Sequence, residues 1–208
     1  KASNHIVDIL PTGCITKKCE QKELTEMYEM HLNGAVAFTD DKKTISNTML
    51  INNALEYVKN FNGLIMNSCL DPYLNQFGQI NEGVISTKMG LGPSPELAED
   101  LMVSRDLSLL RYTQSKLHLS TISSKTALKE IKKAKNEKLN ISSDVAAHNL
   151  ILNDTVFNNF NSDFKVMPPL RDETTRLLLI KAVINGTIDA VSSDHTPIEI
   201  ESKKCEFQ

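Results

Sequence analysis

The stretch Gly186-Thr187-Ile188-Asp189-Ala190-Val191-Ser192-Ser193-Asp194-His195-Thr196-Pro197 contains a helix end, an apolar strand and a polar turn. The preceding residues 173–184 have helical character, and Asn185-Gly186 is favourable chemistry for ending a helix. Residues 188–193 predict a strand, and Asp194-His195 follow it directly. A helix that leads into a strand is typical of a parallel sheet, because parallel neighbours need a crossover connection.

The same alternation of strand and helix extends upstream. Residues 71–95 interrupt it, because they are Gly-rich and poorly periodic, which predicts a long excursion loop with a short helix. The expected strands are residues 6–10, 35–38, 63–66, 116–121 and 140–145, and the expected helices are residues 22–32, 46–60, 95–113 and 124–137. In the helix that starts at residue 95, four leucines are expected to face inward, namely Leu97, Leu101, Leu107 and Leu110.

Two α/β architectures accommodate this order, an open doubly wound sheet and a (β/α)₈ barrel of the TIM type. The first strand-to-helix turn lacks G-x-G-x-x-G, and no G-x-x-x-x-G-K occurs, which disfavours a nucleotide-binding sheet. Polar residues follow the expected strands, at the position where barrel enzymes carry their chemistry. We therefore predict a partial barrel with about six of the eight strands, forming a single domain over residues 1–208. These polar residues are Asp40-Asp41, Asn67-Ser68, Thr121 and Asp194-His195.

The composition excludes several classes of protein. Lys and Arg number 23 against 26 Asp and Glu, so no basic excess is available for binding nucleic acid. The apolar runs are too short to cross a bilayer. The chain begins at Lys1 without a methionine, and we expect it to be a piece of a longer protein.

The cysteines add an expectation about location and redox state. They stand at positions 14, 19, 69 and 205 without C-x-x-C spacing, which argues against a zinc knuckle or a redox pair. We expect Cys14, Cys19 and Cys69 to be ordinary small residues of the barrel. Such sparse cysteines and the lack of a recognisable signal sequence favour a cytoplasmic protein.

Five segments, in order along the chain, carry a more specific pattern. They read A-V-A-F-T-D-D at residues 35–41, L-H-L-S-T-I-S at 117–123, D-V-A-A-H-N-L at 144–150, F-K-V-M-P-P-L-R at 164–171 and G-T-I-D-A-V-S-S-D-H-T-P at 186–197. This series resembles the dihydroorotase family of the amidohydrolase superfamily, in which the last two segments read F-K-V-N-P-P-L-R and G-x-I-D-x-I-x-T-D-H-A-P-H. On this reading the chain covers barrel strands three to eight.

The resemblance implies reversible opening of a cyclic amide in pyrimidine biosynthesis. In the family, zinc lowers the pKa of a bound water so that hydroxide exists at neutral pH. The implied metal ligands are an H-x-H pair, an acidic or carbamylated residue, two later histidines and an aspartate that also moves the proton. The H-x-H segment would lie upstream of Lys1.

The implied metal ligands map onto this chain with two losses. Asp194 falls on the proton-shuttling aspartate, which makes it the expected catalytic residue and a metal ligand. Asp41, or its neighbour Asp40, falls on the acidic ligand. Ser68 and Thr121 stand where the family has its two later histidines, and hydroxyls are not usual zinc ligands. Zinc is therefore expected from the family but weakly held or absent here.

The implied substrate contacts are also altered. Met167 replaces the asparagine of N-P-P-L-R, and Ile198 replaces the last histidine of D-H-A-P-H. Neither side chain can supply the hydrogen bonds that a polar ring substrate needs. His195 and Arg171 retain the family residues and are expected to contact substrate.

Three functions stay open at this point. The first is a catalytically degenerate dihydroorotase-like protein with a structural or regulatory role, which the resemblance implies would assemble with aspartate transcarbamoylase or with itself. The second is an active zinc-dependent dihydroorotase with Asp194 as base and Asp41 as ligand. The third is a barrel that binds a small molecule without chemistry. His118 is expected in the core or between layers, and His148 in a hydrogen-bonding or loop-packing role.

Overall fold

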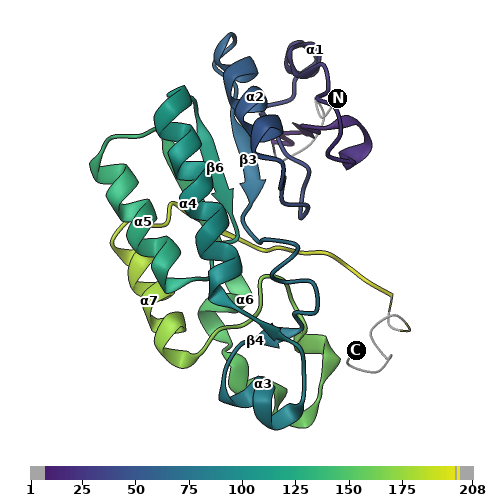
Figure 1. Ribbon diagram of the computed structural model, residues 1–208, viewed down its shortest axis with the longest axis vertical. Coiled ribbons are helices and arrows are strands. Elements are labelled where there is room, and N and C mark those ends of the chain that lie inside the picture. Colours follow the sequence, from purple (N-terminus) through teal and green to yellow (C-terminus); the bar gives the residue numbers. More distant parts are fainter. Residues whose placement is uncertain (1–7, 200, 202–208) are drawn as a thin grey trace.

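Six short parallel strands form one sheet in the order β1-β2-β3-β6-β7-β8 (Figure 1). The computed structural model describes residues 8–199 and 201. The strands follow one another along the chain, each paired in parallel with its neighbour, which is the arrangement of half a (β/α)₈ barrel. The predicted partial barrel is confirmed. The strands are β1 (Thr12–Gly13), β2 (Ala37–Phe38), β3 (Ile65–Ser68), β6 (Leu117–Ser120), β7 (Ile141–Ala146) and β8 (Ala190–Ser192).

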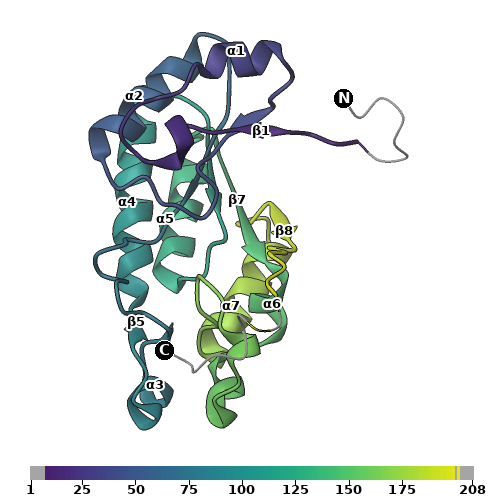
Figure 2. The ribbon, with the colours of Figure 1, turned by 90° about the vertical axis from the view of Figure 1, so that its right-hand side faces the viewer.

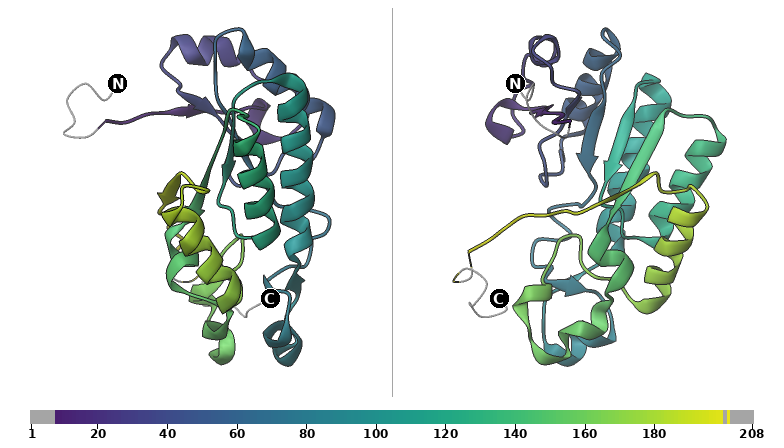
Figure 3. Two further views of the ribbon diagram at one scale, coloured as in Figure 1. Left: turned by 90° about the vertical axis from the view of Figure 1, so that its left-hand side faces the viewer. Right: turned by 180° about the vertical axis from the view of Figure 1, so that it is seen from behind.

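The long helices cover one face of this sheet and leave the other face open (Figure 3). They are α2 (Thr48–Lys59), α4 (Glu96–Thr113), α5 (Lys125–Asn136) and α7 (Glu173–Ile184), with the short α1 (Met27–Leu32) and α6 (Ala147–Ile151) at the strand ends. Figure 2 shows α4 and α5 running alongside each other. Within the described part of the chain, no helix has the length and apolar character needed to cross a membrane.

Alternation along the strands creates the two faces. In β3, Ile65 and Asn67 are buried beneath the helices, whereas Met66 and Ser68 are half-buried on the other face. Strand β6 repeats the pattern in register, because Met66 pairs with His118 and Ser68 with Ser120. One face therefore contributes to the apolar core, and the other offers polar side chains to the interior of the half-barrel.

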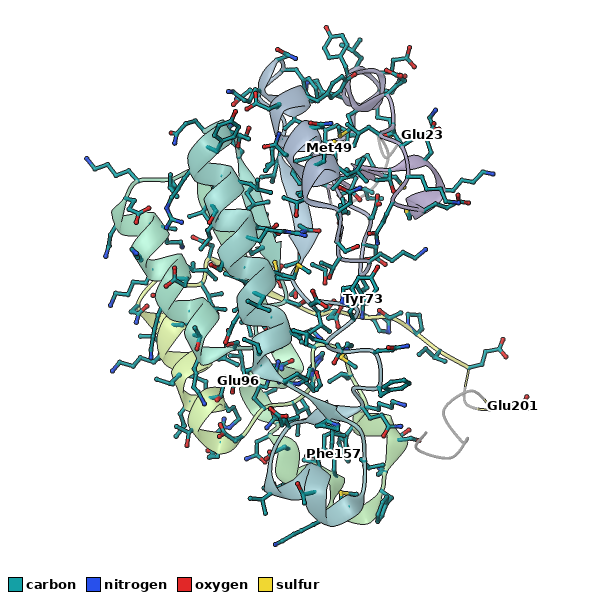
Figure 4. The ribbon with its side chains drawn as sticks, in the orientation of Figure 1. Glu23, Met49, Tyr73, Glu96, Phe157 and Glu201 are labelled. Carbon is teal, nitrogen blue, oxygen red and sulfur yellow. The ribbon has the colours of Figure 1, made fainter. Side chains whose placement is uncertain are left out.

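The predicted excursion loop is confirmed and contains more structure than expected. It holds β4 (Ile80–Asn81), α3 (Val84–Met89) and β5 (Pro93–Ser94), and the two strands pair in parallel as a separate small sheet. Ile80, Phe157 and Leu170 form a second core cluster here, with Phe157 fully buried at the lower end of the molecule (Figure 4). The 3₁₀ helices Asp154–Asn159 and Ser162–Phe164 belong to the same end.

Two expectations about the N-terminal part are wrong. Residues 8–10 of the expected strand at 6–10 are not extended into a ladder, and residues 6–7 lie outside the described residues. The strand is instead Thr12–Gly13, because its pairing with β2 decides its place. The helix expected at 22–32 begins only at Met27, after the 3₁₀ turn Lys17–Cys19.

Helix α4 shows a further correction. Leu107 and Leu110 are buried as expected, but Leu97 and Leu101 are about half exposed, at 53% and 49%. The stripe that faces the core instead includes two acidic residues, Glu99 and Asp106, which are held by hydrogen bonds in the interior. The domain assignment over residues 1–208 stays a prediction.

Candidate functional site

A cavity of about 490 Å³ lies at the carboxyl ends of the parallel strands. Parallel strands in sequence order bring these ends to the same edge of the sheet, so residues distant in sequence meet there. The segment after β8 crosses the open face of the sheet (Figure 3, right), and its Asp194 lines the cavity. Part of the wall comes from residues in the strands or just after them, namely Thr39, Asp41, Ser68, Cys69, Ser120, Thr121, Asp144, Ser192 and Asp194.

The cavity collects five of the residues selected from the sequence. Asp41 follows β2, Ser68 ends β3, Thr121 follows β6 and Asp194 follows β8, while Met167 enters from the loop before α7. Asp41, Thr121 and Asp194 all have positive φ, which turns the chain sharply at the strand ends. The spatial cluster that the resemblance implies is thus present in the fold, whatever its chemistry.

Asp40 and Asp41 are separated by the turn although they are adjacent in sequence. Asp40 is buried, and its Oδ1 accepts hydrogen bonds from the backbone amides of Ile15 and Thr16 at 2.9 Å each. Its Oδ2 accepts the hydroxyl of Thr16. Asp40 therefore stabilises the loop after β1, and Asp41 alone of the pair lines the cavity.

Two expected substrate contacts, His195 and Arg171, and the position of a lost contact, Ile198, are not brought to the cavity. His195 and Ile198 are exposed on the segment after β8, and neither lines the cavity wall. Ile198 is 53% exposed. Arg171 is buried, with only 2% of its surface accessible. The motifs give the place of these residues along the chain. Where each side chain points depends on the conformation of the surrounding loop, which the motifs do not specify.

The guanidinium of Arg171 joins separate parts of the fold through hydrogen bonds. Its Nη1 donates to Asn81 Oδ1 at 3.1 Å and to the carbonyl of Ser94 at 2.9 Å, and its Nε donates to Ser123 Oγ at 3.1 Å. Its Nη2 lies 3.6 Å from Oε2 of Glu99. The guanidinium thus joins the small β4–β5 sheet to α4 and to the start of α5, behind the cavity wall that Glu99 contributes.

The Asp194 carboxylate is paired with a lysine. Lys42 Nζ lies 2.9 Å from Oδ1 and 3.0 Å from Oδ2 of Asp194, so the ammonium engages both oxygens. The Asp194 side chain is only 11% exposed, whereas that of Lys42 is 42% exposed. Lys42 was not among the residues expected at the site. It pairs with a residue 152 positions further along the chain, so no local sequence signal could have identified it.

A polar network on the open face surrounds Asp144, which sequence reasoning also did not select. His118 Nε2 lies 2.8 Å from Asp144 Oδ2, and His118 Nδ1 lies 2.8 Å from Ser142 Oγ. Ser192 Oγ and the amide of Thr121 donate to Asp144 Oδ1 at 2.8 and 3.1 Å. Burial by itself raises the pKa of Asp144, but the hydrogen bonds from His118, Ser192 and Thr121 together hold that pKa below its ordinary value. Asp144 is consequently an ionised, fully engaged acceptor.

His148 stands at the start of α6 beside this network. Its Nε2 is buried and has no hydrogen-bond partner among the residues described. Burial lowers the pKa of His148, the charge of Asp194 opposes that shift, and the charge of Lys42 adds to it. The imidazole is therefore neutral at pH 7.

The pKa of His148 predicts how stability depends on pH. The folded-state pKa lies below the unfolded value, so the folded protein binds fewer protons and loses stability as the pH falls below about 6.5. We expect His148→Gln to lose less stability than wild type between about pH 8 and about pH 5. Urea denaturation across that range measures the difference, with the exposed His195→Gln as matched control. Equal pH slopes for wild type and His148→Gln would contradict the assignment.

The donor set in the cavity does not suit a zinc ion. Zinc in proteins is held by thiolates, imidazoles and carboxylates. Of the positions that the resemblance assigns to ligands, Ser68 and Thr121 offer hydroxyls, and Asp194 is already paired with an ammonium. Cys69 lines the cavity, but burial raises the pKa of its thiol well above the ordinary value, so it stays protonated. Asp41 is left as the one unengaged acidic group at those assigned positions.

Comparison with known proteins gives a consistent family. A family model described as "Dihydro-orotase-like" matches residues 2–127. The dihydroorotase of Streptomyces coelicolor is 36% identical over 202 residues, covering 96% of this chain and 47% of that protein. The dihydroorotase of Carboxydothermus hydrogenoformans is 33% identical over 207 residues, covering 100% of this chain and 48% of that protein. The chain thus spans about half the length of the curated relatives it matches.

Solved structures agree on the fold. The L-hydantoinase (dihydropyrimidinase) from Arthrobacter aurescens superposes with a TM-score of 0.72 at 19% identity, covering 86% of this chain and 42% of that chain. The dihydroorotase from Saccharomyces cerevisiae in complex with 5-fluoroorotic acid gives a TM-score of 0.66 at 17% identity, covering 94% and 55%. At these identities the likeness concerns the half-barrel itself.

Proposed function

The chain belongs to the dihydro-orotase-like family, and we propose that it is a catalytically degenerate member with a structural or regulatory role in pyrimidine biosynthesis. The observation that carries this proposal is the Lys42–Asp194 pair inside the cavity, at 2.9 and 3.0 Å. The relatives named dihydroorotase are the reason for placing the chain in pyrimidine biosynthesis. The altered side chains at the metal-ligand positions are the reason for proposing that it has lost their catalytic activity.

The pair opposes metal-dependent chemistry in two ways. The Lys42 ammonium contacts both oxygens of Asp194 and takes one lone-pair position on each, so a metal ion would have to displace it or share the carboxylate with it. It also repels a second cation, and this repulsion is strong where the aspartate is largely shielded from water. Ser68 and Thr121 add no anionic or imidazole donor that offsets the repulsion. The residues at this cavity therefore do not fit a hydrolytic zinc ion.

The implied substrate-contact position at Met167 also lacks the polar group that the family has there. Met167 presents its thioether, and Asn75 Nδ2 lies 3.6 Å from its Sδ. A cyclic amide bound here would leave its polar edge without partners at Met167, which costs about 1–3 kcal/mol for each unpaired group. The cavity has a volume of about 490 Å³, which is enough for a small molecule, and its wall at Met167 favours an apolar edge on that molecule.

For the partner, we propose assembly with aspartate transcarbamoylase or self-association, in the cytoplasm. This rests on the family resemblance, in which inactive homologues assemble with that enzyme. Co-purification from the native host, followed by mass spectrometry of the bound proteins, tests it. Recovery of the transcarbamoylase or of a homo-oligomer supports the role, and a monomer with neither partner argues for the small-molecule binding alternative.

The experiment that tests the loss of catalysis measures zinc content and turnover together. The protein is purified as its full natural chain without chelator, and its zinc is quantified by mass spectrometry before dihydroorotate turnover is assayed with added zinc. We expect far less than one zinc ion per chain, and a rate of dihydroorotate turnover no higher than that in buffer without the protein. Stoichiometric zinc with turnover would reject degeneracy and favour an active dihydroorotase that uses Asp41 and Asp194.

A further inference from the structure

The loop after β1 brings two cysteines into contact. Cys14 directly follows β1, and Cys19 ends the 3₁₀ turn Lys17–Cys19. The Cys19 thiol donates a hydrogen bond to Cys14 Sγ at an Sγ–Sγ distance of 3.4 Å. Both residues are accessible, since Cys14 is exposed and Cys19 is partly exposed. A search for C-x-x-C spacing does not find this pair, because four residues separate the two cysteines. The turn at Lys17–Cys19 reverses the chain and brings their sulfurs together.

We propose that Cys14 and Cys19 form a reversible intramolecular disulfide, which makes this loop a redox modification site. The two sulfurs already touch, so the bond needs only a small local approach and no rearrangement of the sheet. Strand β1 fixes the Cys14 end of the loop, and hydrogen bonds fix the middle, where Asp40 accepts the amides of Ile15 and Thr16.

The oxidant is a peroxide, and the step balances without any other reactant. The exposed Cys14 sulfur attacks hydrogen peroxide, loses its proton and becomes a sulfenic acid, with release of one water. The Cys19 thiol then attacks the Cys14 sulfur, loses its proton and expels a second water. The two thiols lose two electrons and two protons, and the peroxide is reduced to two waters.

The environment of the pair assigns the order of events. The hydrogen bond to Cys14, burial and the charge of Asp40 raise the pKa of Cys19 to about 11, so Cys19 is a thiol at neutral pH. Cys19 is also the less exposed of the two sulfurs, so we assign the first reaction with peroxide to the more exposed Cys14 and the resolution of the sulfenic acid to Cys19.

The disulfide would also act on the rim of the cavity. The carbonyl of Cys19 accepts a hydrogen bond from Lys43 Nζ at 3.3 Å, and Gln21 Oε1 accepts from the amide of Ser46 at 3.1 Å. Both Lys43 and Gln21 line the cavity. Closing the disulfide therefore holds the loop that positions these two side chains. This consequence does not depend on whether the cavity is catalytic.

The test exploits two lysines that lie between the cysteines. The full natural chain is reduced, desalted, treated with hydrogen peroxide, alkylated and digested with trypsin, which cleaves after Lys17 and Lys18. We expect a pair of tryptic peptides joined by a Cys14–Cys19 bond, a mass lower by two hydrogen atoms in the intact protein, and reversal by dithiothreitol. The matched control is Cys69→Ala, which removes a buried thiol and should leave the cross-link intact.

Three results would overturn the proposal. They are sulfinic acid on Cys14 without a cross-link, disulfides only between separate chains, and cross-linking of either cysteine to Cys69 instead. Cys14→Ser and Cys19→Ser should each abolish the joined peptides, and persistence of the mass loss in either variant would also reject it. Hydrogen exchange provides the second readout, since amides over residues 15–25 should exchange more slowly in the oxidised protein and recover on reduction. Unchanged exchange would reject the effect on the cavity rim.

Discussion

Replacing Arg171 by methionine is expected to lower the free energy of unfolding by about 3–5 kcal/mol, because it leaves a buried carboxylate without its cation. Glu99 is 2% exposed, and burial raises the pKa of its carboxyl despite the nearby Arg171 charge. Its Oε1 accepts the amides of Ser123 and Ser124 at 2.8 Å each. These bonds favour the ionised form, which methionine at 171 would leave uncompensated in the interior.

Urea denaturation followed by circular dichroism measures this loss. The matched control is Arg176→Met, which removes an arginine that pairs with the exposed Glu173, where the contact is 2.6 Å but water reaches the carboxylate and screens it. We expect a far smaller change for the control. The double variant Arg171→Met, Glu99→Gln should recover part of the loss, since it removes the buried charge. A loss for Arg171→Met no greater than the control would reject the structural role and return Arg171 to the substrate contacts.

The triple variant Lys42→Ala, Ser68→His, Thr121→His is expected to gain zinc affinity by more than about 100-fold, because even outer-shell partners change metal affinity about 10- to 100-fold. The lysine change frees the Asp194 carboxylate, and the two imidazoles enter from the ends of β3 and β6. Competition with a chromogenic chelator measures the affinity in the full natural chain.

Two further variants locate the new zinc site. Adding Asp194→Ala to the triple variant should remove the gain, because this carboxylate is the ligand that Lys42 had occupied. Placing the second histidine at Ser120 instead of Thr121 should weaken the gain, because Ser120 is the last residue of β6 and Thr121 lies in the turn after it, so the imidazole would start from a different backbone position. No gain in the triple variant would mean that Ser68 and Thr121 do not correspond to ligand positions.

Local chemistry explains the elements that were predicted well. Helix α7 has the expected bounds, Glu173–Ile184, because Asp172 accepts the amide of Thr175 at its start and Asn185-Gly186 ends it. Helix α2 begins after Asn47, whose side chain caps it. The two-residue strand β1 was misplaced, since so short a strand has little propensity of its own and takes its position from pairing with β2.

The sequence by itself determined the family, the parallel alternation and the residue types at the strand ends, because these depend on chain order and local propensity. The tertiary structure alone decided which of those residues share a cavity. It placed the Asp41 side chain at the cavity, whereas the Asp40 side chain accepts hydrogen bonds from the loop after β1. It also buried Arg171 beside Glu99. It also placed Lys42 on Asp194 across the sheet. Such pairings join residues far apart in the chain, and their geometry arises only when strands, turns and helices pack together, so no local pattern encodes them.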